Sequence, residues 1–390
     1  MTKTENMTPT FLPVLESWPR ERVLERLHAA SADDVRRALN AGRLHVEDML
    51  RLLSPAASEL LEALARRAHD EHLRHFGRAV NLFTPLYISD HCTNQCRYCG
   101  FNARNKQERH HLTMEEVERE TEAVARSGLS HVLLLTGEAR RLASPAYIAE
   151  AAGVIRRHMA SVHVEVYAMT QEEYALLLAG GVDGVTLFQE TYNRELYARL
   201  HPAGPKRDFV FRLEAPGRAA AAGMRAIGFG ALLGLDDWRC DAFYAALHAH
   251  WLQGVHPSVE CGMSVPRLRP SGAHFTDILP VADRDLAQYI SALRCFLPRL
   301  GITVSTRERA ELRDKLLPLG VSRMSAGVST AVGTRAGGHS GEGQFVIADT
   351  RGVEELSDDL ARMGYQAVLK DWEDPGPPPA AQEDRHARSA

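Results

Sequence analysis

The sequence has few cysteines and lacks long apolar runs. Six cysteines in 390 residues are too few for a disulfide framework, and no apolar run approaches the roughly 20 residues that cross a bilayer. The opening residues 1–6 lead into no continuous apolar segment of the kind found in secretory signals. We therefore expect a cytoplasmic protein without a membrane partner.

An excess of charge of one sign is lacking as well. The 46 Lys and Arg residues and 50 Asp and Glu residues give a net charge of -4, so no overall positive field attracts nucleic acid. Hydrophobic residues at 45% and charged residues at 25% are ordinary globular proportions. These proportions exclude disordered, collagen-like and coiled-coil chains, and nucleic acid is not an expected partner.

The first 80 residues are Arg-rich and have helical periodicity. Ser31 precedes Asp33 and Asp34 as a helix N-cap precedes an acidic first turn, and residues 58–76 repeat apolar side chains on one helical face. Residues 1–80 are therefore predicted to form a helical N-terminal extension.

After this extension, short β-rich apolar runs alternate with helical segments. This alternation is typical of parallel βαβ units, and eight such runs predict an α/β fold, a closed (β/α)8 barrel of the TIM type over residues 81–335. An open doubly wound sheet is the alternative, although no GxGxxG motif follows the first run. The predicted strands are Leu82–Ile88, His131–Leu135, His163–Tyr167, Gly184–Phe188, Ala226–Leu233, Ser258–Val265, Ile302–Ser305 and Arg323–Val328.

The remaining residues predict a small C-terminal extension over 336–373. Residues 331–343 are glycine-rich and indicate a flexible loop more than a phosphate-binding loop, since no Lys-Ser or Lys-Thr pair follows. Apolar residues 344–347 predict a last strand, and 353–363 predict a helix. The Pro-rich residues 374–390 are expected to be a disordered tail.

The strongest chemical signal is a CxxxCxxC motif formed by Cys92, Cys96 and Cys99, immediately after the first predicted strand. In a (β/α)8 barrel this position lies at the C-terminal face, where active sites are built. Three closely spaced thiolates are typical of an iron-sulfur cluster, and they leave one iron without a protein ligand.

Zinc is the alternative metal for this motif. A fourth zinc ligand would have to come from one of three nearby histidines, namely His91, His110 or His111. The other cysteines show no metal-ligand spacing and are expected to be ordinary buried residues; they are Cys240, Cys261 and Cys295.

With the aromatic Tyr98 directly before the last cysteine, the motif resembles the signature of radical S-adenosylmethionine (SAM) enzymes. The resemblance implies that the three cysteines hold a 4Fe-4S cluster and that Tyr98 belongs to the cofactor site. It also implies that the amino and carboxylate groups of SAM chelate the fourth iron. An electron from the cluster then splits SAM and yields a 5'-deoxyadenosyl radical.

The same resemblance implies a SAM pocket. Thr136-Gly137-Glu138 ends the second predicted strand, where the family binds the SAM amino group through a glycine-rich segment. By the resemblance, Glu190 binds polar groups of SAM and Arg212 holds its carboxylate. Glu165 is a candidate for the ribose hydroxyls, because a carboxylate accepts two donors. Each charged residue has an alternative interpretation as half of an ion pair at the barrel mouth.

Further motifs indicate which group of radical SAM enzymes the chain resembles. In their order along the chain they resemble the aromatic amino acid lyases of the radical SAM superfamily, above all the tyrosine lyases of thiamine thiazole biosynthesis, the 2-iminoacetate synthases. These enzymes cleave the Cα–Cβ bond of L-tyrosine to 2-iminoacetate (dehydroglycine) and 4-methylphenol. A thiazole synthase and a flavodoxin- or ferredoxin-type electron donor are the implied partners. The motifs are 188–192, 211–214, 265–270, 305–308, 325–327 and 370–372.

A free amino acid substrate requires a cation for its carboxylate. Arg307, at the end of the seventh predicted strand, offers the forked guanidinium that binds a carboxylate through two hydrogen bonds. Ser325 or Ser329 is a candidate for a supporting hydroxyl. Tyr87 is a candidate for the wall of the same pocket, or else an aromatic residue that fills the barrel top.

Two other functions remain as alternatives. No cysteine follows Cys295, which disfavours the tyrosine lyase that matures iron-only hydrogenase, because that relative carries a cysteine-rich C-terminal extension. A tryptophan lyase lacks the extension and stays open as the alternative enzyme. An iron-sulfur or zinc scaffold without turnover is the alternative outside enzymes, but it would have no need of a SAM pocket.

Overall fold

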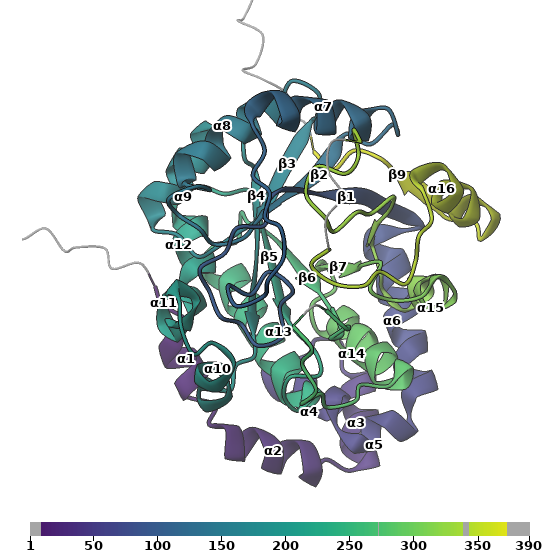
Figure 1. The fold of residues 1–390 in the computed structure, drawn as a ribbon. Helices are drawn as coiled ribbons and strands as arrows, with labels where there is room; N and C mark the ends of the chain where they lie inside the picture. Colours follow the sequence, from purple (N-terminus) through teal and green to yellow (C-terminus); the bar gives the residue numbers. More distant parts are fainter. Residues whose placement is uncertain (1–8, 272, 338–342, 373–390) are drawn as a thin grey trace, which may run out of the picture.

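Eight parallel strands close into a barrel in the computed structural model, which describes residues 9–271, 273–337 and 343–372 (Figure 1). Each strand pairs with the next, and β1 closes the ring by pairing with both β2 and β8. The predicted closed (β/α)8 barrel is confirmed. The strands are β1 (Ala79–Ser89), β2 (His131–Thr136), β3 (Ser161–Glu165), β4 (Gly184–Glu190), β5 (Ala226–Ala231), β6 (Glu260–Ser264), β7 (Gly301–Val304) and β8 (Arg323–Ser325).

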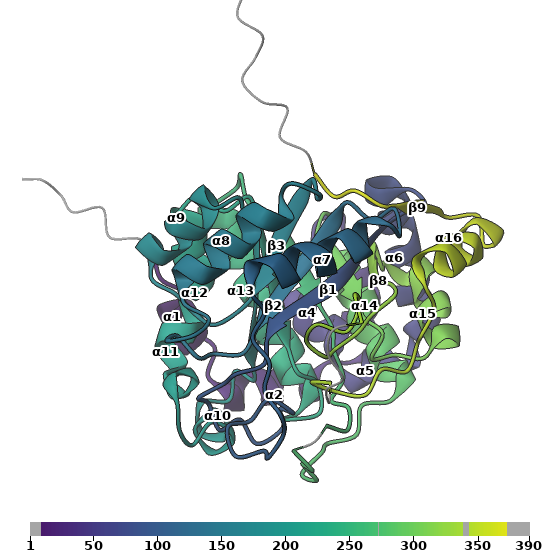
Figure 2. The ribbon, with the colours of Figure 1, turned by 45° about the horizontal axis from the view of Figure 1, so that its top comes forward.

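Helices between the strands cover the outside of the barrel, as α7 and α8 do beside β1 to β3 (Figure 2). The capping box expected at the start of α7 is present, because Thr113 and Glu116 each accept a hydrogen bond from the other's backbone N–H. The helices are α7 (Met114–Ala125), α8 (Pro145–Ile155), α9 (Gln171–Ala179), α10 (Arg194–Leu200), α11 (Phe209–Leu213), α12 (Ala215–Ala221), α13 (Trp238–Val255), α14 (Asp283–Phe296) and α15 (Ala310–Leu316), with 3-10 turns η1 (Pro205–Arg207) and η2 (Leu317–Leu319).

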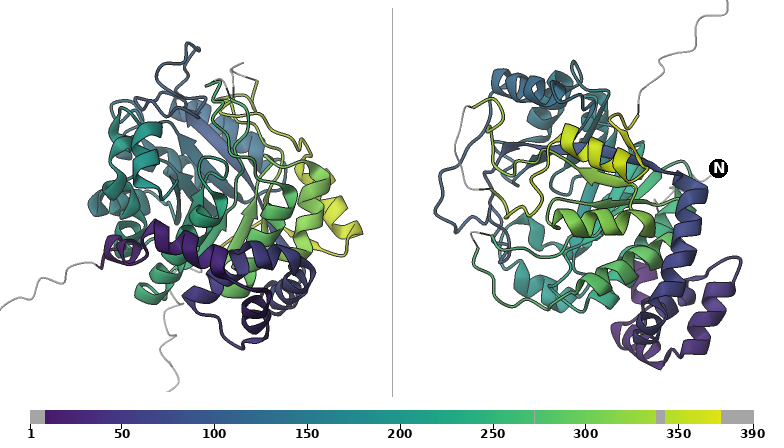
Figure 3. Two further views of the ribbon diagram at one scale, coloured as in Figure 1. Left: turned by 90° about the horizontal axis from the view of Figure 1, so that it is seen from below. Right: turned by 90° about the vertical axis from the view of Figure 1, so that its right-hand side faces the viewer.

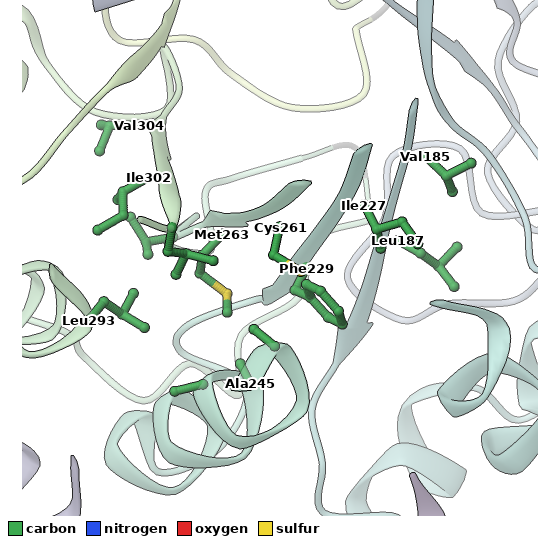
Figure 4. Packing of buried hydrophobic residues seen from close by; sticks show 14 of the residues in the cluster. Val185, Leu187, Ile227, Phe229, Ala245, Cys261, Met263, Leu293, Ile302 and Val304 are labelled. Atoms are coloured by element: carbon green, nitrogen blue, oxygen red, sulfur yellow. The ribbon is translucent and has the colours of Figure 1, made fainter. Parts of the chain in front are cut away.

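Side chains alternate along each strand, so that one set packs outward against the helices and the other set faces the inside of the barrel. Phe229 of β5 and Met263 of β6 point outward and pack with Ala245 of α13 (Figure 4). The residues between these outward side chains face the interior, and in β5 they are glycines 228 and 230. Small residues on the inner face leave room inside the barrel for a cavity.

The N-terminal extension is helical, as predicted, and lies along one side of the barrel (Figure 3). The predicted Ser31 cap is formed, with Asp34 completing a capping box. The extension is fixed to the barrel through α14, where the Gln288 side chain donates to the carbonyls of Leu52 and Ser54, both at 2.9 Å. Its helices are α1 (Leu12–Glu16), α2 (Arg20–Ala29), α3 (Ala32–Asn40), α4 (Val46–Leu53), α5 (Pro55–Glu59) and α6 (Leu61–Phe76).

The predicted order of the C-terminal extension is wrong. Residues 344–347 form no strand, because Gln344 and Val346 donate their N–H groups to two different loops, at Thr330 and Pro270. The predicted helix is present as α16 (Val353–Arg362), and the last strand, β9 (Gln366–Val368), follows it and pairs with the start of β1. Within the glycine-rich loop, residues 331–337 form turns and 338–342 lie outside the described residues, as does the predicted tail 374–390.

Asp371 closes the N-terminal end of the barrel. Its buried carboxylate lies 2.7 Å from Arg225 Nη2 and 3.0 Å from Arg323 Nη2, and it accepts a hydrogen bond from Asn81 at 3.1 Å. Burial opposes ionisation, but the charge of Arg323 and the groups around it hold the pKa of Asp371 well below its usual range. The cavities of the barrel lie toward its opposite, C-terminal end.

Every helix in the described part of the chain is too short or too polar to cross a bilayer. The division of the chain at residues 80, 335 and 373 stays a prediction.

Candidate active site

Two cavities meet at the C-terminal end of the barrel. The first, here called the thiol cavity, has a volume of about 640 Å³, part of it open to solvent, and is lined by the three predicted cluster cysteines. The second, the barrel cavity, has a volume of about 580 Å³, also partly open to solvent, and is lined by Arg307 among other residues. The residues that line both cavities are Tyr87, Leu135, Glu165, Phe188 and Gln344. A ligand in one cavity therefore lies directly against a ligand in the other.

The cysteine loop packs against the end of β2. Thr93 donates its backbone N–H to the carbonyl of Glu138 at 2.9 Å, and Gly137 donates to the carbonyl of Ser89 at 2.8 Å. A Cβ on Gly137 would overlap the carbonyl of His91, so this position requires glycine for loop packing. Sequence reasoning explained this glycine by the approach of a ligand, whereas the contact observed is with the loop itself.

The three cysteines fit an iron-sulfur cluster better than a single zinc ion. A zinc ion with Zn–S bonds of about 2.3 Å brings its sulfurs to about 3.8 Å from one another. Among the described residues, neither group of three potential ligands with all their atoms within 4.8 Å contains a cysteine. Burial also raises the pKa of the Cys96 thiol to about 12, so its thiolate requires a bound cation. Either metal would supply that cation, but in a cluster each cysteine binds a separate iron, so the spacing alone disfavours the zinc alternative.

Tyr98 packs beside Lys206, whose Nζ lies 5.7 Å from the centroid of the tyrosine ring. Its side chain is 7% exposed, packs with Leu200 and Leu232, and hydrogen-bonds through its hydroxyl to His201 Nε2 at 2.8 Å. Tyr98 does not line the thiol cavity. Its side chain therefore anchors the cysteine loop to α10.

Glu190, Lys206 and Arg212 form a charged cluster in the wall of the thiol cavity. Lys206 Nζ lies 2.6 Å from Glu190 Oε1, and Arg212 Nη2 lies 3.8 Å from the same oxygen. Burial opposes ionisation of Glu190, but the Lys206 and Arg212 charges hold its pKa below the usual value. Two cations face one carboxylate, so the cluster carries an excess positive charge that suits an anionic group of a ligand.

The backbone of Glu190 is strained. Its φ of +73° lies in the left-handed region, which a residue with a Cβ seldom adopts. The register between β4 and β5 shifts at this point, between Phe188 and Glu190. The distortion turns the carboxylate toward Lys206, and strain of this kind is characteristic of functional sites.

The segment predicted to bind the SAM amino group also lines the thiol cavity. The Thr136 hydroxyl is buried and has no hydrogen-bond partner in the described part of the chain. The Glu138 carboxylate accepts a hydrogen bond of 2.6 Å from the Asn94 side chain, whose oxygen in turn accepts from the Lys206 N–H at 2.9 Å. Asn94 thus fixes the positions of both Glu138 and Lys206.

Glu165 stands in the wall between the two cavities. Burial raises the pKa of its carboxyl to about 7, although the charge of Arg307 opposes this shift. Near neutral pH the group is therefore present in both protonation states.

Arg307 is the cation of the barrel cavity. Its guanidinium carbon lies 3.4 Å from the centroid of the Phe345 ring, and burial lowers its pKa. Among the described residues no carboxylate forms an ion pair with it. A half-buried, unpaired guanidinium is suited to the carboxylate of a ligand. Ser325 lines the same cavity, whereas the Ser329 hydroxyl bonds to Thr334 at 2.6 Å and lies elsewhere.

Sequence reasoning missed Lys206 and the segment of Gln344 and Phe345. Gln344 accepts a hydrogen bond from the Tyr87 hydroxyl at 2.8 Å, and its amide nitrogen lies 3.8 Å from Cys99 Sγ. It therefore joins a wall of the barrel cavity to a cluster ligand. The turn that precedes Lys206 could have drawn attention to this residue. In that turn Gly204, at φ +95°, packs against Asn94 of the cysteine motif.

Comparisons with known proteins agree with this geometry. The Radical SAM superfamily model matches residues 86–245, and the Biotin and Thiamin Synthesis associated domain matches residues 264–366. The 2-iminoacetate synthase of Escherichia coli is 40% identical over 349 residues, which cover 89% of this chain and 93% of that protein. The chain belongs to the 2-iminoacetate synthase family of radical SAM proteins. The resemblance drawn from the motifs is confirmed.

Two further known proteins are similar to this chain. The 2-iminoacetate synthase of Salmonella typhimurium is 39% identical, again over 89% of this chain and 93% of that protein. The FeFe-hydrogenase maturase HydG from Carboxydothermus hydrogenoformans has a TM-score of 0.81 at 30% identity, over 92% of this chain and 82% of that chain.

Proposed function

We propose that this radical SAM protein cleaves the Cα–Cβ bond of L-tyrosine to give 2-iminoacetate and 4-methylphenol. One observation carries the proposal: a cavity with three cysteines and a positive cluster shares a wall with a largely apolar cavity that contains Arg307, which forms no ion pair with any described carboxylate. Such an arrangement places a radical source next to an aromatic amino acid. One hydrogen of tyrosine would pass to 5'-deoxyadenosine, and the released 4-hydroxybenzyl fragment would take up an electron from the donor and a proton to become 4-methylphenol.

In this proposal the thiol cavity holds the cofactors. Cys92, Cys96 and Cys99 bind three irons of a 4Fe-4S cluster, and Arg212 with Lys206 receives the carboxylate of SAM. Thr136 has an unused hydroxyl for another polar atom of SAM. When bound, the cluster would supply the electron that splits SAM, and the wall shared by the two cavities would bring the substrate next to the point of cleavage.

The barrel cavity holds tyrosine by its two ends. Arg307, held flat against Phe345, binds the α-carboxylate, and the apolar walls receive the aromatic ring. Tyr87 and Ser325 fill the space beside the carboxylate. Orientation of this kind places the hydrogen to be abstracted toward the shared wall, and a misplacement of about 1 Å can cost about a hundredfold in rate.

The chemistry of the product implies a protein partner. 2-Iminoacetate is an imine that water hydrolyses to glyoxylate and ammonia, so direct transfer to a thiazole synthase protects it. We propose such an acceptor, together with a flavodoxin- or ferredoxin-type electron donor.

Product identity tests the proposed function. The protein is reconstituted anaerobically with iron and sulfide, reduced, and given SAM with tyrosine or with tryptophan. We expect 4-methylphenol and glyoxylate from tyrosine. Turnover of tryptophan with tyrosine left intact would instead establish the tryptophan lyase, and no 5'-deoxyadenosine with either substrate would favour the scaffold.

A further inference from the structure

Three hydroxyl groups that line the barrel cavity, those of Ser264, Thr303 and Thr306, have no hydrogen-bond partner among the described residues. Ser264 ends β6 and Thr303 lies in β7, and both line the cavity and are half-buried. In the described part of the chain neither hydroxyl is engaged in a hydrogen bond. The other cavity serines are engaged, because Ser325 accepts from the Thr306 N–H at 3.1 Å and Ser305 from the Arg307 N–H at 3.4 Å.

Two of these hydroxyls, those of Ser264 and Thr303, are neighbours. Ser264 and Thr303 are partners in the parallel register of β6 and β7, so they share one face of the sheet on strands about 4.8 Å apart. The alternate residues, Met263 and Ile302, belong to the outward layer that packs against the helices (Figure 4). Both hydroxyls therefore face the barrel interior and can reach one common atom of a ligand.

These hydroxyls lie at the end of the cavity away from Arg307. Thr303 lies in β7, which ends at Val304 and runs toward the barrel mouth, and Arg307 follows three residues beyond that end. The surrounding cavity wall is apolar, with Phe83 and Leu133 contributed by β1 and β2. Unsatisfied hydroxyls in apolar surroundings are unfavourable unless a ligand completes their hydrogen bonds.

The ligand that fits this pattern has a flat apolar body with a carboxylate at one end and a hydroxyl at the other. A phenol both donates and accepts a hydrogen bond, and so it can engage two neighbouring hydroxyls at once. Resting on the proposed function, we propose that Ser264 and Thr303 form the subsite for the phenol hydroxyl of tyrosine. The pair makes the enzyme select tyrosine over phenylalanine.

The test compares two substrates in the reconstituted holoenzyme. Ser264→Ala, Thr303→Val and the double variant are assayed with tyrosine and with phenylalanine, and glyoxylate is measured because both substrates would yield it. The parent should prefer tyrosine strongly. In the double variant the ratio of kcat/KM for tyrosine to that for phenylalanine should fall by about tenfold to a hundredfold, the effect of two lost hydrogen bonds.

A matched control comes from β4. Thr186 faces the barrel interior beside Gly228 but does not line the cavity, so Thr186→Val should leave the substrate ratio unchanged. Iron content and 5'-deoxyadenosine formation verify that each variant is loaded. If the double variant fails to load, the nearly isosteric Thr303→Val alone should still lower the ratio.

The outcomes separate the two proposals. A parent that cleaves tyrosine, with an unchanged ratio in loaded variants, overturns the phenol subsite and leaves the proposed function standing. A parent that forms glyoxylate from phenylalanine or tryptophan and ignores tyrosine overturns both.

Discussion

Replacing Lys206 with Met tests how far the thiol cavity depends on one buried ion pair. Lys206 Nζ lies 2.6 Å from Glu190 Oε1, and the two side chains are 13% and 9% exposed. Removing one partner of a buried pair costs about 3–5 kcal/mol, because the other charge stays buried. Arg212, at 3.8 Å from the same oxygen, keeps part of the compensation. We therefore expect Lys206→Met to lower the free energy of unfolding by about 3 kcal/mol.

The assay is urea unfolding of the cluster-free protein at pH 7, followed by tryptophan fluorescence. Glu190→Gln serves as the companion variant, since it keeps the shape of the side chain and removes the charge. The double variant should lose less stability than the two single losses added together, because neither charge is then left alone. A loss below about 1 kcal/mol in Lys206→Met, the range of exposed pairs, would refute the reasoning, as would additive losses.

Three further predictions concern the cluster, SAM and pH. Cys96→Ala should abolish cluster assembly measured as bound iron and sulfide, whereas Cys240→Ala, which removes a buried thiol in α13, should not; full iron content in Cys96→Ala would contradict the assignment. Arg212→Ala should weaken SAM binding by about tenfold or more with the cluster intact, and calorimetry with unchanged affinity would count against it. Because burial raises the pKa of Glu165 to about 7, the folded protein keeps a proton that the unfolded chain releases near pH 4.3, so the contribution of this one group to the stability of the cluster-free protein should fall as pH rises from about 4 to 7. Glu165→Gln should remove that contribution, and identical urea midpoints against pH in parent and variant would show that the group is not buried.

The barrel could be predicted from the sequence because each of its signals is local. The apolar runs, the cap at Thr113 and the CxxxCxxC motif each lie within a few residues, and parallel strands bring their ends to one face of the barrel. Because Arg307, Glu165 and Glu190 each lie at the end of a predicted strand, the sequence predicted that they lie on the same face as the cysteines. All three line the cavities of the folded protein.

The residues that sequence reasoning missed or misplaced depend on contacts between distant segments. Gln344 follows a glycine-rich loop and begins an apolar run that resembles a strand, yet it crosses the barrel mouth to Tyr87. Lys206 follows a Pro/Gly turn whose position is set by Asn94, 112 residues earlier. The place of Tyr98 in the cofactor site stays a prediction, since its hydroxyl bonds to His201 while its ring lies beside Lys206. Local spacing does not encode the direction in which such side chains point.

The central claim is that the two adjoining cavities couple SAM cleavage to tyrosine cleavage. Its most direct test is anaerobic single-turnover analysis of 4-methylphenol and 5'-deoxyadenosine in the parent and in Arg307→Lys, which keeps the charge but loses the forked geometry. We predict nearly one 4-methylphenol per 5'-deoxyadenosine in the parent, and slow 5'-deoxyadenosine formation with little 4-methylphenol in the variant. Formation of 5'-deoxyadenosine in the parent without 4-methylphenol, or 4-methylphenol at the parent rate in Arg307→Lys, would contradict the account.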